Sequence, residues 1–333
     1  MRIKMLVATV DTQYVKLLSD NISEYHADII EVSICSTLEC LQETLARRKY
    51  DVALIDAEMI IKADLKTIHL PLLLWSEHEP AVDIPGEPER IQKYQRISSI
   101  VAAVLERYAK VSKIKHSSDS RYANITAVWS PAGGVGKTTV ALAYTSSKVS
   151  DDKEVFYLNL ETFSSVPGYF SENGKSISAA FEMLDSLDGN LMMLIQGICN
   201  KENGLTYLCS PDNFDDMCIL SAENISELVA SCARLADELV IDLSCVCDAR
   251  TRAIFEIADQ ILIVTEPSIF AKVKLDQFIS QNNVFEHIKE KTSIVANKGA
   301  IIEKPATDII ISFPLVQSNE AIEVCRILSG IGF

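Results

Sequence analysis

The sequence predicts an α/β protein built from two parallel-sheet domains, and three observations lead to this fold class. Short apolar runs alternate with helical patterns in the first hundred residues and again after residue 123, as in strands joined by helical crossovers. The stretch 110–124 is polar, rich in Ser and Lys, and without periodicity, which is typical of a linker. The chain has 333 residues, more than one domain usually contains, and 48% are hydrophobic. We therefore expect a domain over 1–110, a linker over 111–122 and a second domain over 123–333.

The expected elements follow the alternation of apolar and helical segments. In the first domain the strands are IKMLVATVD, DIIEVSICS, YDVALID and PLLLW, with helices near 12–25, 36–48 and 97–110. In the second domain the strands are NITAVWS, EVFYLNLE, GLTYLCS, ELVIDLS, QILIVTEP, TSIVANKG and DIIISFPL. Helices are expected from residue 137, between 175 and 200, and near 221–236, 248–258, 268–282 and 318–329. Seven such strands predict a doubly wound sheet.

The composition excludes several classes of function. The formal net charge of -15 repels nucleic-acid backbones and anionic lipids, so no nucleic-acid partner is expected. The nine cysteines are an odd number and have no metal-ligand spacing, which indicates reduced thiols. With no signal peptide at the polar start of the sequence, we expect a cytoplasmic location. No apolar run approaches the roughly 20 residues of a membrane span, so no integral membrane segment is expected.

A glycine-rich loop follows the strand NITAVWS and precedes a strongly helical run. Its sequence, GGVGKTT, has glycines where backbone N–H groups must turn toward a phosphate without a Cβ in the way. The lysine would neutralise the β- and γ-phosphates, and the first threonine would ligate Mg²⁺. We expect this loop to bind ATP and Mg²⁺ through Gly133, Gly134, Val135, Gly136, Lys137, Thr138 and Thr139. The alternative is a glycine turn with no ligand.

A second acidic residue should help to hold the metal. Asp242 ends the apolar strand ELVIDLS, and open α/β sheets bind their ligands at that edge. We expect Thr138 and Asp242 to be the metal ligands, with a simple strand-end cap as the alternative for Asp242.

Several motifs together resemble the MinD/ParA group of deviant P-loop ATPases. They are GGVGKTT, YLNLE, VIDL, ADQILIVTEPS and VANKG, and they span essentially all of 123–333. The resemblance implies an ATP-dependent homodimer that positions other cellular machinery. Members of the group carry a signature lysine before the two glycines, which reaches across the dimer to the partner's nucleotide. This sequence has Ala132 there, so we expect hydrolysis to be slow, absent or supplied differently.

Two further positions take their expected roles from the same resemblance. The second strand of the group usually carries two aspartates, one of which positions the attacking water; here the residues are Asn159 and Glu161. Glu161 is the candidate catalytic residue, with a solvated strand-end acid as the alternative. Asn297 falls where the group recognises adenine, with a turn asparagine as the alternative.

The first domain resembles a response-regulator receiver domain of flavodoxin-like fold. Asp56 and Asp11 end two of its strands, and Lys93 stands near the place of the receiver's phosphate-contacting lysine. Tyr94 replaces the proline that usually follows that lysine, and the acidic pair after the first strand is reduced to Asp11. Because such a metal site is under-charged, we expect a pseudo-receiver that docks a partner rather than a domain phosphorylated at Asp56.

The domain pair as a whole resembles the TadZ/CpaE family of Tad (Flp) pilus assembly proteins. The resemblance implies an ATPase half that dimerises and a receiver-like half that binds pilus or secretion assembly proteins. It also implies recruitment to the cell pole or the inner membrane face by those partners.

Three alternatives stay open. The first is a MinD-like ATPase cycling on a membrane in cell-division positioning. The tail SNEAIEVCRILSGIGF has one arginine and two glutamates, which favours packing against the ATPase core instead. The second is a ParA-like DNA partition protein, against which the acidic charge balance counts. The third is a signalling protein phosphorylated at Asp56.

Overall fold

The computed structural model describes residues 2–27, 29–76, 88–111, 123–171, 174–186, 191–302, 307–318 and 320–332. These residues divide into two compact units. Unit 1 contains the described residues up to 111 together with 191–197, and unit 2 contains the others. The expected linker, apart from its first residue, lies outside the described residues.

Unit 1 is built on a five-stranded parallel sheet with the order β2-β1-β3-β4-β5. Its strands are β1 (Ile3–Ala8), β2 (Ile30–Cys35), β3 (Tyr50–Asp56), β4 (Ile68–Trp75) and β5 (Arg90–Gln92). This order is the flavodoxin-like one, in which the strand order reverses between β1 and β3. The three-residue strand β5 was not predicted from the sequence. Ligands of such sheets bind outside the carboxyl ends of the strands at the reversal point.

Two apolar cores cover the two faces of this sheet. One contains buried side chains of α1 (Thr12–Tyr25) and α4 (Ile97–Val111), and the other contains those of α2 (Leu38–Arg47) and the short α3 (Ala57–Ile60). Asp11 and Thr37 cap α1 and α2, because each side chain accepts a backbone N–H of the first turn. Both caps follow strand ends and fix where the chain leaves the sheet.

Unit 2 is built on an eight-stranded sheet with the order β13-β12-β11-β6-β10-β7-β9-β8. Seven strands are parallel and correspond to the seven predicted ones: β6 (Asn124–Trp129), β7 (Val155–Leu160), β9 (Leu205–Tyr207), β10 (Glu238–Leu243), β11 (Gln260–Thr265), β12 (Thr292–Ala296) and β13 (Ile309–Ser312). The eighth strand, β8 (Asn200–Glu202), pairs antiparallel with β9 and was not predicted. Asn203 and Gly204 between them have φ of 53° and 78°, as a tight hairpin turn requires.

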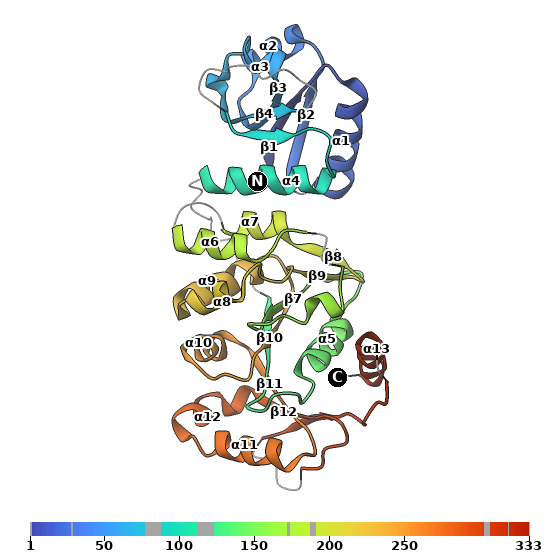
Figure 1. The fold of residues 1–333 in the computed structure, drawn as a ribbon, viewed down its shortest axis with the longest axis vertical. Helices are drawn as coiled ribbons and strands as arrows, with labels where there is room; N and C mark the ends of the chain where they lie inside the picture. Colours follow the sequence, from blue (N-terminus) through green and yellow to red (C-terminus); the bar gives the residue numbers. More distant parts are fainter. Residues whose placement is uncertain are drawn as a thin grey trace. The chain divides into compact units, whose positions relative to one another are not determined.

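Helices cover both faces of the unit 2 sheet, with α5 and α13 on one face and α9 and α10 on the other (Figure 1). The helices of unit 2 are α5 (Lys137–Lys148), α6 (Ser178–Ser186), α8 (Phe214–Ile219), α9 (Ala222–Ala233), α10 (Ala249–Ile257), α11 (Ile269–Ile279), α12 (Asn282–Ile288) and α13 (Ala321–Ile331). Helix α7 (Leu191–Ile198) belongs to unit 1 except for its last residue. The helix expected over 268–282 is therefore shorter, and a second one follows it. Gln281 separates them because its ψ of 79° is not helical.

The closing helix α13 packs on the P-loop helix α5. Leu328 is 1% exposed, and Val324 and Cys325 pack beside it against the core of unit 2. This confirms the expected packing of the tail SNEAIEVCRILSGIGF, through α13, against the core of unit 2. Among the described residues, no helix has both the length and the apolar character needed to cross a bilayer.

Candidate functional site

The glycine-rich loop connects the central strand β6 to helix α5. Gly134 and Gly136 have φ of 76° and 88°, a conformation that other residues rarely adopt. A Cβ at Gly133 or Gly134 would meet no heavy atom within 4 Å, so open space lies beside this backbone. Helix α5 begins at Lys137 directly after the loop, and its free N–H groups favour an anion. The loop therefore has the backbone conformation and the space to receive a phosphate chain.

Lys137 is buried at the start of this helix. Among the described residues, its ammonium group has no hydrogen-bond or ion-pair partner. A largely desolvated charge without a partner is costly. An anionic ligand would therefore be bound strongly at this position.

Asp242 is 0% exposed at the end of β10. Its Oδ2 atom accepts hydrogen bonds from the Tyr157 hydroxyl at 2.9 Å and from Asn159 Nδ2 at 3.1 Å. Its Oδ1 atom is buried without a hydrogen-bond partner. Burial, with repulsion from the Glu161 carboxylate as the next cause, raises the pKa of Asp242 to about 7. One oxygen of the carboxylate is thus fixed by protein donors, and the other is left for a cation.

The residues around Asp242 suit a magnesium ion held together with a nucleotide. Thr138 supplies a hydroxyl and Asp242 an unpaired carboxylate oxygen, and Mg²⁺ prefers oxygen ligands. In the part of the chain that the structure describes, no group of three or more His, Cys, Asp or Glu side chains could hold a metal alone. The remaining ligands would be phosphate oxygens and water, as is usual for Mg²⁺.

Glu161 lies beside the threonine that would ligate this metal. Its Oε2 atom accepts from the Thr138 hydroxyl at 3.3 Å and from the Ser165 hydroxyl at 3.2 Å. The parallel pairing of β7 with β10 sets Asn159 directly opposite Asp242, and Glu161 follows two residues later. Glu161 is therefore brought to the site and is not a solvated strand-end acid, while its catalytic role remains a prediction.

Asn297 and Lys298 hold the outside of the glycine-rich loop. The Asn297 Nδ2 atom donates to the carbonyl of Val135 at 2.8 Å, and the Lys298 ammonium donates to the carbonyl of Gly134 at 2.7 Å. A Cβ on Gly136 would lie 2.5 Å from Asn297 Nδ2, so a glycine is needed there. The amide predicted to recognise adenine is thus used here to fix the loop, and adenine recognition remains a prediction.

Two other predicted positions lie at the same edge. The Thr139 hydroxyl lies 3.2 Å from the hydroxyl of Tyr169. Ala132 is buried, and its N–H donates to the Ser130 hydroxyl at 3.1 Å. No side-chain cation stands at Ala132, where the resemblance implies a lysine.

Three residues of this site were missed by the sequence analysis: Tyr157, Ser165 and Lys298. For Tyr157 a signal was present, because residues two apart on a strand share a face and Tyr157, Asn159 and Glu161 follow that spacing. For Lys298 no local signal exists, since its contact with Gly134 joins residues 164 apart in the sequence.

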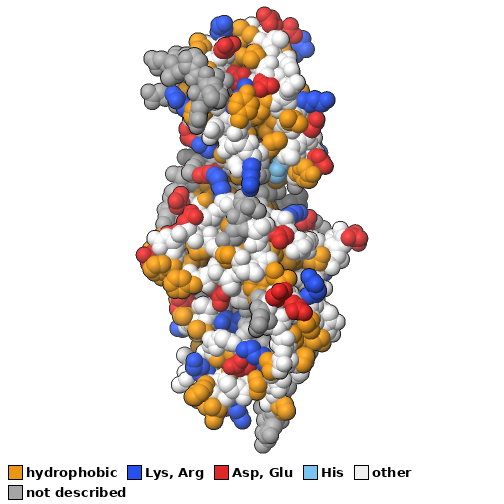
Figure 2. Space-filling model, turned by 45° about the vertical axis from the view of Figure 1, so that its right-hand side comes forward, with side chains coloured by type: hydrophobic (Ala, Val, Ile, Leu, Met, Phe, Trp, Pro, Cys, Tyr) orange, Lys and Arg blue, Asp and Glu red, His pale blue; other side chains and the backbone are white. Residues whose placement is uncertain are grey.

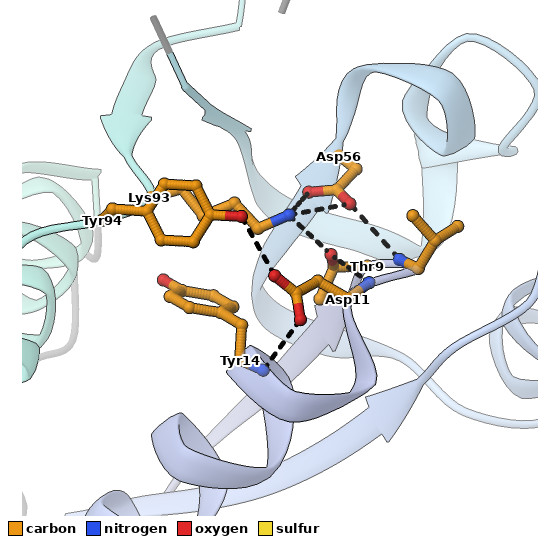
Figure 3. Close-up of polar contacts among 7 residues, drawn as sticks. Thr9, Asp11, Tyr14, Asp56, Lys93 and Tyr94 are labelled. Carbon is orange, nitrogen blue, oxygen red and sulfur yellow. Dashed lines mark hydrogen bonds and ion pairs between the residues drawn. The ribbon is translucent and has the colours of Figure 1, made fainter. Parts of the chain in front are cut away.

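Unit 1 has a polar cluster at the carboxyl ends of β1 and β3, drawn in Figure 3. Asp56 is 5% exposed and Lys93 is 3% exposed. The Lys93 ammonium lies 3.4 Å from Asp56 Oδ2 and 3.5 Å from Oδ1, and it donates to the Thr9 hydroxyl at 3.0 Å. The backbone N–H of Val10 also donates to Asp56 Oδ2, at 3.3 Å. Lys93 therefore lies beside Asp56, and the two form a buried ion pair.

Asp11 is also bound by groups of its own unit. Its Oδ1 atom accepts the backbone N–H of Tyr14 at 3.0 Å, and its Oδ2 atom accepts the Tyr94 hydroxyl at 3.0 Å (Figure 3). These bonds, the backbone one first, lower the pKa of Asp11. The rings of Tyr14 and Tyr94 lie edge to face, and the Tyr14 hydroxyl is buried without a hydrogen-bond partner. Asp56 and Asp11 therefore each have protein donors at both carboxylate oxygens.

The chain is similar in fold to several proteins of known structure. No protein-family model and no curated protein matches this sequence. A ParA-family ATPase from Chlorobium tepidum TLS is 19% identical, with a TM-score of 0.52, and the match covers 64% of this chain and 93% of that one. MinD in a MinC:MinD complex from Aquifex aeolicus is 17% identical with a TM-score of 0.46, covering 62% and 96%. The septum site-determining protein MinD complexed with Mg-ADP from Pyrococcus horikoshii OT3 is 14% identical with a TM-score of 0.46, covering 61% and 86%.

At 19% identity, the match to the ParA-family ATPase establishes the fold alone. It agrees with the eight-stranded sheet, with its glycine-rich loop after the central strand β6. The chain therefore contains the doubly wound P-loop fold of the MinD/ParA ATPases.

Proposed function

We propose that this chain is an ATP-binding, dimerising assembly and localisation factor of the TadZ/CpaE type, which positions the secretion machinery of Tad (Flp) pili. The observation that carries the nucleotide part is the buried Asp242 Oδ1 atom, which has no partner beside the glycine-rich loop. The Lys137 ammonium, which has no hydrogen-bond or ion-pair partner among the described residues, supports the same conclusion because it would attract an anionic ligand. A site with an unpaired buried anion and an unpaired buried cation suits a ligand that carries both charges, such as ATP with Mg²⁺.

Different groups of the site would bind the phosphates and the metal. The backbone N–H groups from Gly133 to Thr138 would donate to the phosphates, and Lys137 would neutralise the β- and γ-phosphates. Thr138 and Asp242 would hold the metal, which supplies charge neutralisation of the phosphates when bound. Asn297 and Lys298 keep the loop in place through the carbonyls of Val135 and Gly134.

We expect weak or absent ATP hydrolysis because of the residues at two positions, Ala132 and Asn159. No side-chain cation can reach a partner's nucleotide from Ala132, and a trans-acting cation contributes a factor on the order of 10³–10⁵ in related phosphoryl transfers. Asn159, in place of a second acid, donates its amide to Asp242 and cannot act as a base. Glu161 is left as the carboxylate that could orient water, and its bond from Thr138 holds it beside the metal position. ATP would then act mainly as a switch for assembly.

Unit 1 would supply the partner-binding half. We infer that the ion pair between Asp56 and Lys93, and the hydrogen bonds to Asp11, compete with a divalent metal for both carboxylates. Phosphorylation of an aspartate in such a sheet needs that metal. We infer a pseudo-receiver that binds pilus or secretion assembly proteins, while unit 2 forms a homodimer.

The test is to measure the size of the full chain with and without ATP and Mg²⁺ while phosphate release is recorded. We expect the ATP-bound form to be a dimer, with slow or undetectable release. Ala132→Lys is expected to keep ATP affinity and to raise phosphate release. Because Ala132 is buried, the unfolding midpoint of the variant is measured first as a control. If the chain stayed monomeric with ATP and released phosphate steadily, the proposal that ATP acts as an assembly switch would be wrong.

The pilus role is tested in the native host. Loss of the gene is expected to abolish Tad pili, and Lys137→Ala is expected to reproduce the loss. Normal piliation in both strains would refute this part and leave the nucleotide site intact.

A MinD/ParA-like ATPase in cell-division or partition positioning is the second candidate, favoured by the fold match to the ParA-family ATPase. Partition through DNA would need a basic surface. On the face drawn in Figure 2, the described Lys and Arg side chains lie singly or in small groups among acidic ones. ATP-dependent binding of DNA that weakens with added salt would support this candidate over the first.

A further inference from the structure

Cys35 and Cys40 lie together where β2 leads into α2 in unit 1. Cys35 is the last residue of β2 and is buried, whereas Cys40 lies in the first turn of α2 and is exposed. The Cys40 thiol donates to the Cys35 sulfur across 3.3 Å, and the Cys35 thiol donates to the Thr44 hydroxyl at 3.4 Å. The fold therefore brings one accessible and one protected sulfur atom into direct contact.

We propose that Cys35 and Cys40 are a redox-active thiol pair that hydrogen peroxide converts into an intramolecular disulfide. The two sulfur atoms need to approach from 3.3 Å to the S–S bond length of about 2.05 Å. Cys35 is held by burial and by Thr44, so rotation of the exposed Cys40 side chain would close the gap. This inference concerns unit 1 and is independent of the nucleotide site.

The order of the two chemical steps follows from exposure. The Cys40 thiolate attacks one peroxide oxygen, the O–O bond breaks, and the leaving hydroxide takes a proton to become water. The resulting Cys40 sulfenic acid is attacked by the Cys35 sulfur, its S–O bond breaks, and the hydroxide leaves with the Cys35 proton as a second water. The two sulfurs together lose two electrons, and one peroxide molecule gains them.

Burial supports this assignment of roles. It raises the pKa of Cys35 to about 11, so Cys35 is mainly a thiol at neutral pH and is a poor first nucleophile. Cys40 is the sulfur that a peroxide in solvent can reach. Cys35 acts second, on a sulfenic sulfur that is already its neighbour.

Oxidation would tie the first turn of α2 to the end of β2, next to the polar cluster of unit 1. The Cys35 carbonyl accepts the backbone N–H of Thr9 at 3.1 Å. The Thr9 hydroxyl in turn accepts from Lys93 at 3.0 Å. The disulfide would thus lie one hydrogen bond away from the strand end that supports the ion pair between Lys93 and Asp56.

The sequence makes the test direct. No Lys or Arg lies between Lys16 and Arg47, so trypsin releases both cysteines in one peptide, 17–47, and Glu39 offers a cleavage site between them. The full chain is treated with increasing hydrogen peroxide, unfolded, alkylated and digested. We expect this peptide to lose both alkyl groups together and to be two hydrogens lighter than its reduced form. Cleavage at the glutamates of this peptide separates the fragment with Cys35 from the fragment with Cys40, because Glu39 lies between them. These two fragments should stay joined until a reductant is added.

Variants and a control within the same chain complete the design. Cys40→Ser should leave Cys35 open to alkylation at every dose, and Cys35→Ala should yield a Cys40 sulfenic acid that dimedone traps. Cys218 is also exposed and serves as the matched control, which should still be alkylated at the dose that converts the pair. Oxidation of Cys40 to the sulfinic acid with Cys35 still free would overturn the proposal. Loss of Cys218 alkylation before the pair reacts would do the same.

Discussion

Each of the two units has an aspartate at or next to the last residue of a buried central strand, yet the two carboxylates have opposite surroundings. Asp56 in unit 1 has the Lys93 ammonium and the Val10 N–H beside its oxygens, at 3.4 Å and 3.3 Å. Asp242 in unit 2 has both of its donors on Oδ2 and none on Oδ1. We infer that Asp56, which has a direct ion pair, is a structural element, whereas Asp242, which has an oxygen without a donor among the described residues, belongs to a binding site. Sheet topology alone would make both edges candidate sites.

The largest effect is expected from removing the internal cation of unit 1. Lys93→Met leaves Asp56 as a buried charge without its partner, and such a loss costs about 3–5 kcal/mol. Hydrogen exchange of unit 1 peptides in the full chain measures this directly, since β3 should open far more often. The double variant Lys93→Met with Asp56→Leu should recover most of the stability. If Lys93→Met alone exchanged like the wild type, the ion pair would not be a structural element.

Removing the cation of unit 2 should have the opposite outcome. Lys137→Ala is expected not to lower the stability without nucleotide, because Lys137 has no hydrogen-bond or ion-pair partner among the described residues and its burial as a charge is costly. It should weaken ATP binding by about 10²–10³-fold, the equivalent of about 3–4 kcal/mol of charge-assisted hydrogen bonds. Competition against a fluorescent ATP analogue gives the ratio of Kd values. Lys148→Ala, at the other end of α5, is the matched control and should bind as the wild type does.

A smaller effect concerns the pH dependence of stability without nucleotide or metal. The pKa of Asp242 is raised to about 7 in the folded chain, and it is about 3.9 in an unfolded one. The folded state therefore binds this proton more tightly, and its stability should fall as the pH rises from about 4 to about 7. Asp242→Asn removes this loss and should raise the unfolding midpoint at pH 8 by about 2–4 °C or more in a chelating buffer. An unchanged pH profile in the variant would show that Asp242 does not carry the unpaired charge.

The smallest effect is expected at the hydroxyl that orients Asp242. Tyr157→Phe removes the 2.9 Å bond to Oδ2 and leaves the bond from Asn159. One hydrogen bond to a charged group contributes about 1.5–3 kcal/mol, but the remaining donor should limit the loss of Mg²⁺-dependent ATP affinity to about tenfold. The affinity measured without Mg²⁺ should not change. Equal losses with and without Mg²⁺ would indicate a general packing defect.

The parts of this structure that were predicted from sequence rest on local patterns. The alternation of apolar and helical segments predicted the α/β fold class, and the GGVGKTT run after an apolar strand predicted where the glycine-rich loop lies. The strand β8 was missed although Asn203 and Gly204, a favoured hairpin pair, stand before β9. The break between α11 and α12 was missed because no Gly or Pro marks it.

Contacts between distant residues could not be read from the sequence. Asn297 looked like a base-recognition residue or a turn asparagine, and its bond to Val135 joins residues 162 apart. Lys93 was placed near Asp56 only by resemblance, and its burial as an ion pair depends on how β1, β3 and β5 assemble. The unpaired Oδ1 atom of Asp242 follows from the register of β7 against β10, which sets Asn159 opposite it.

One calorimetric series tests which of the two aspartates belongs to the nucleotide and metal site. In this series ATP with Mg²⁺ is titrated into the wild type, Asp56→Asn and Asp242→Asn. Asn keeps a side-chain oxygen for the neighbouring donors in both variants. We expect one ATP per chain in the wild type, the same Kd in Asp56→Asn, and a Kd at least about tenfold weaker in Asp242→Asn. No heat with the folded wild type, or a loss confined to Asp56→Asn, would contradict the assignment of the nucleotide and metal site to unit 2.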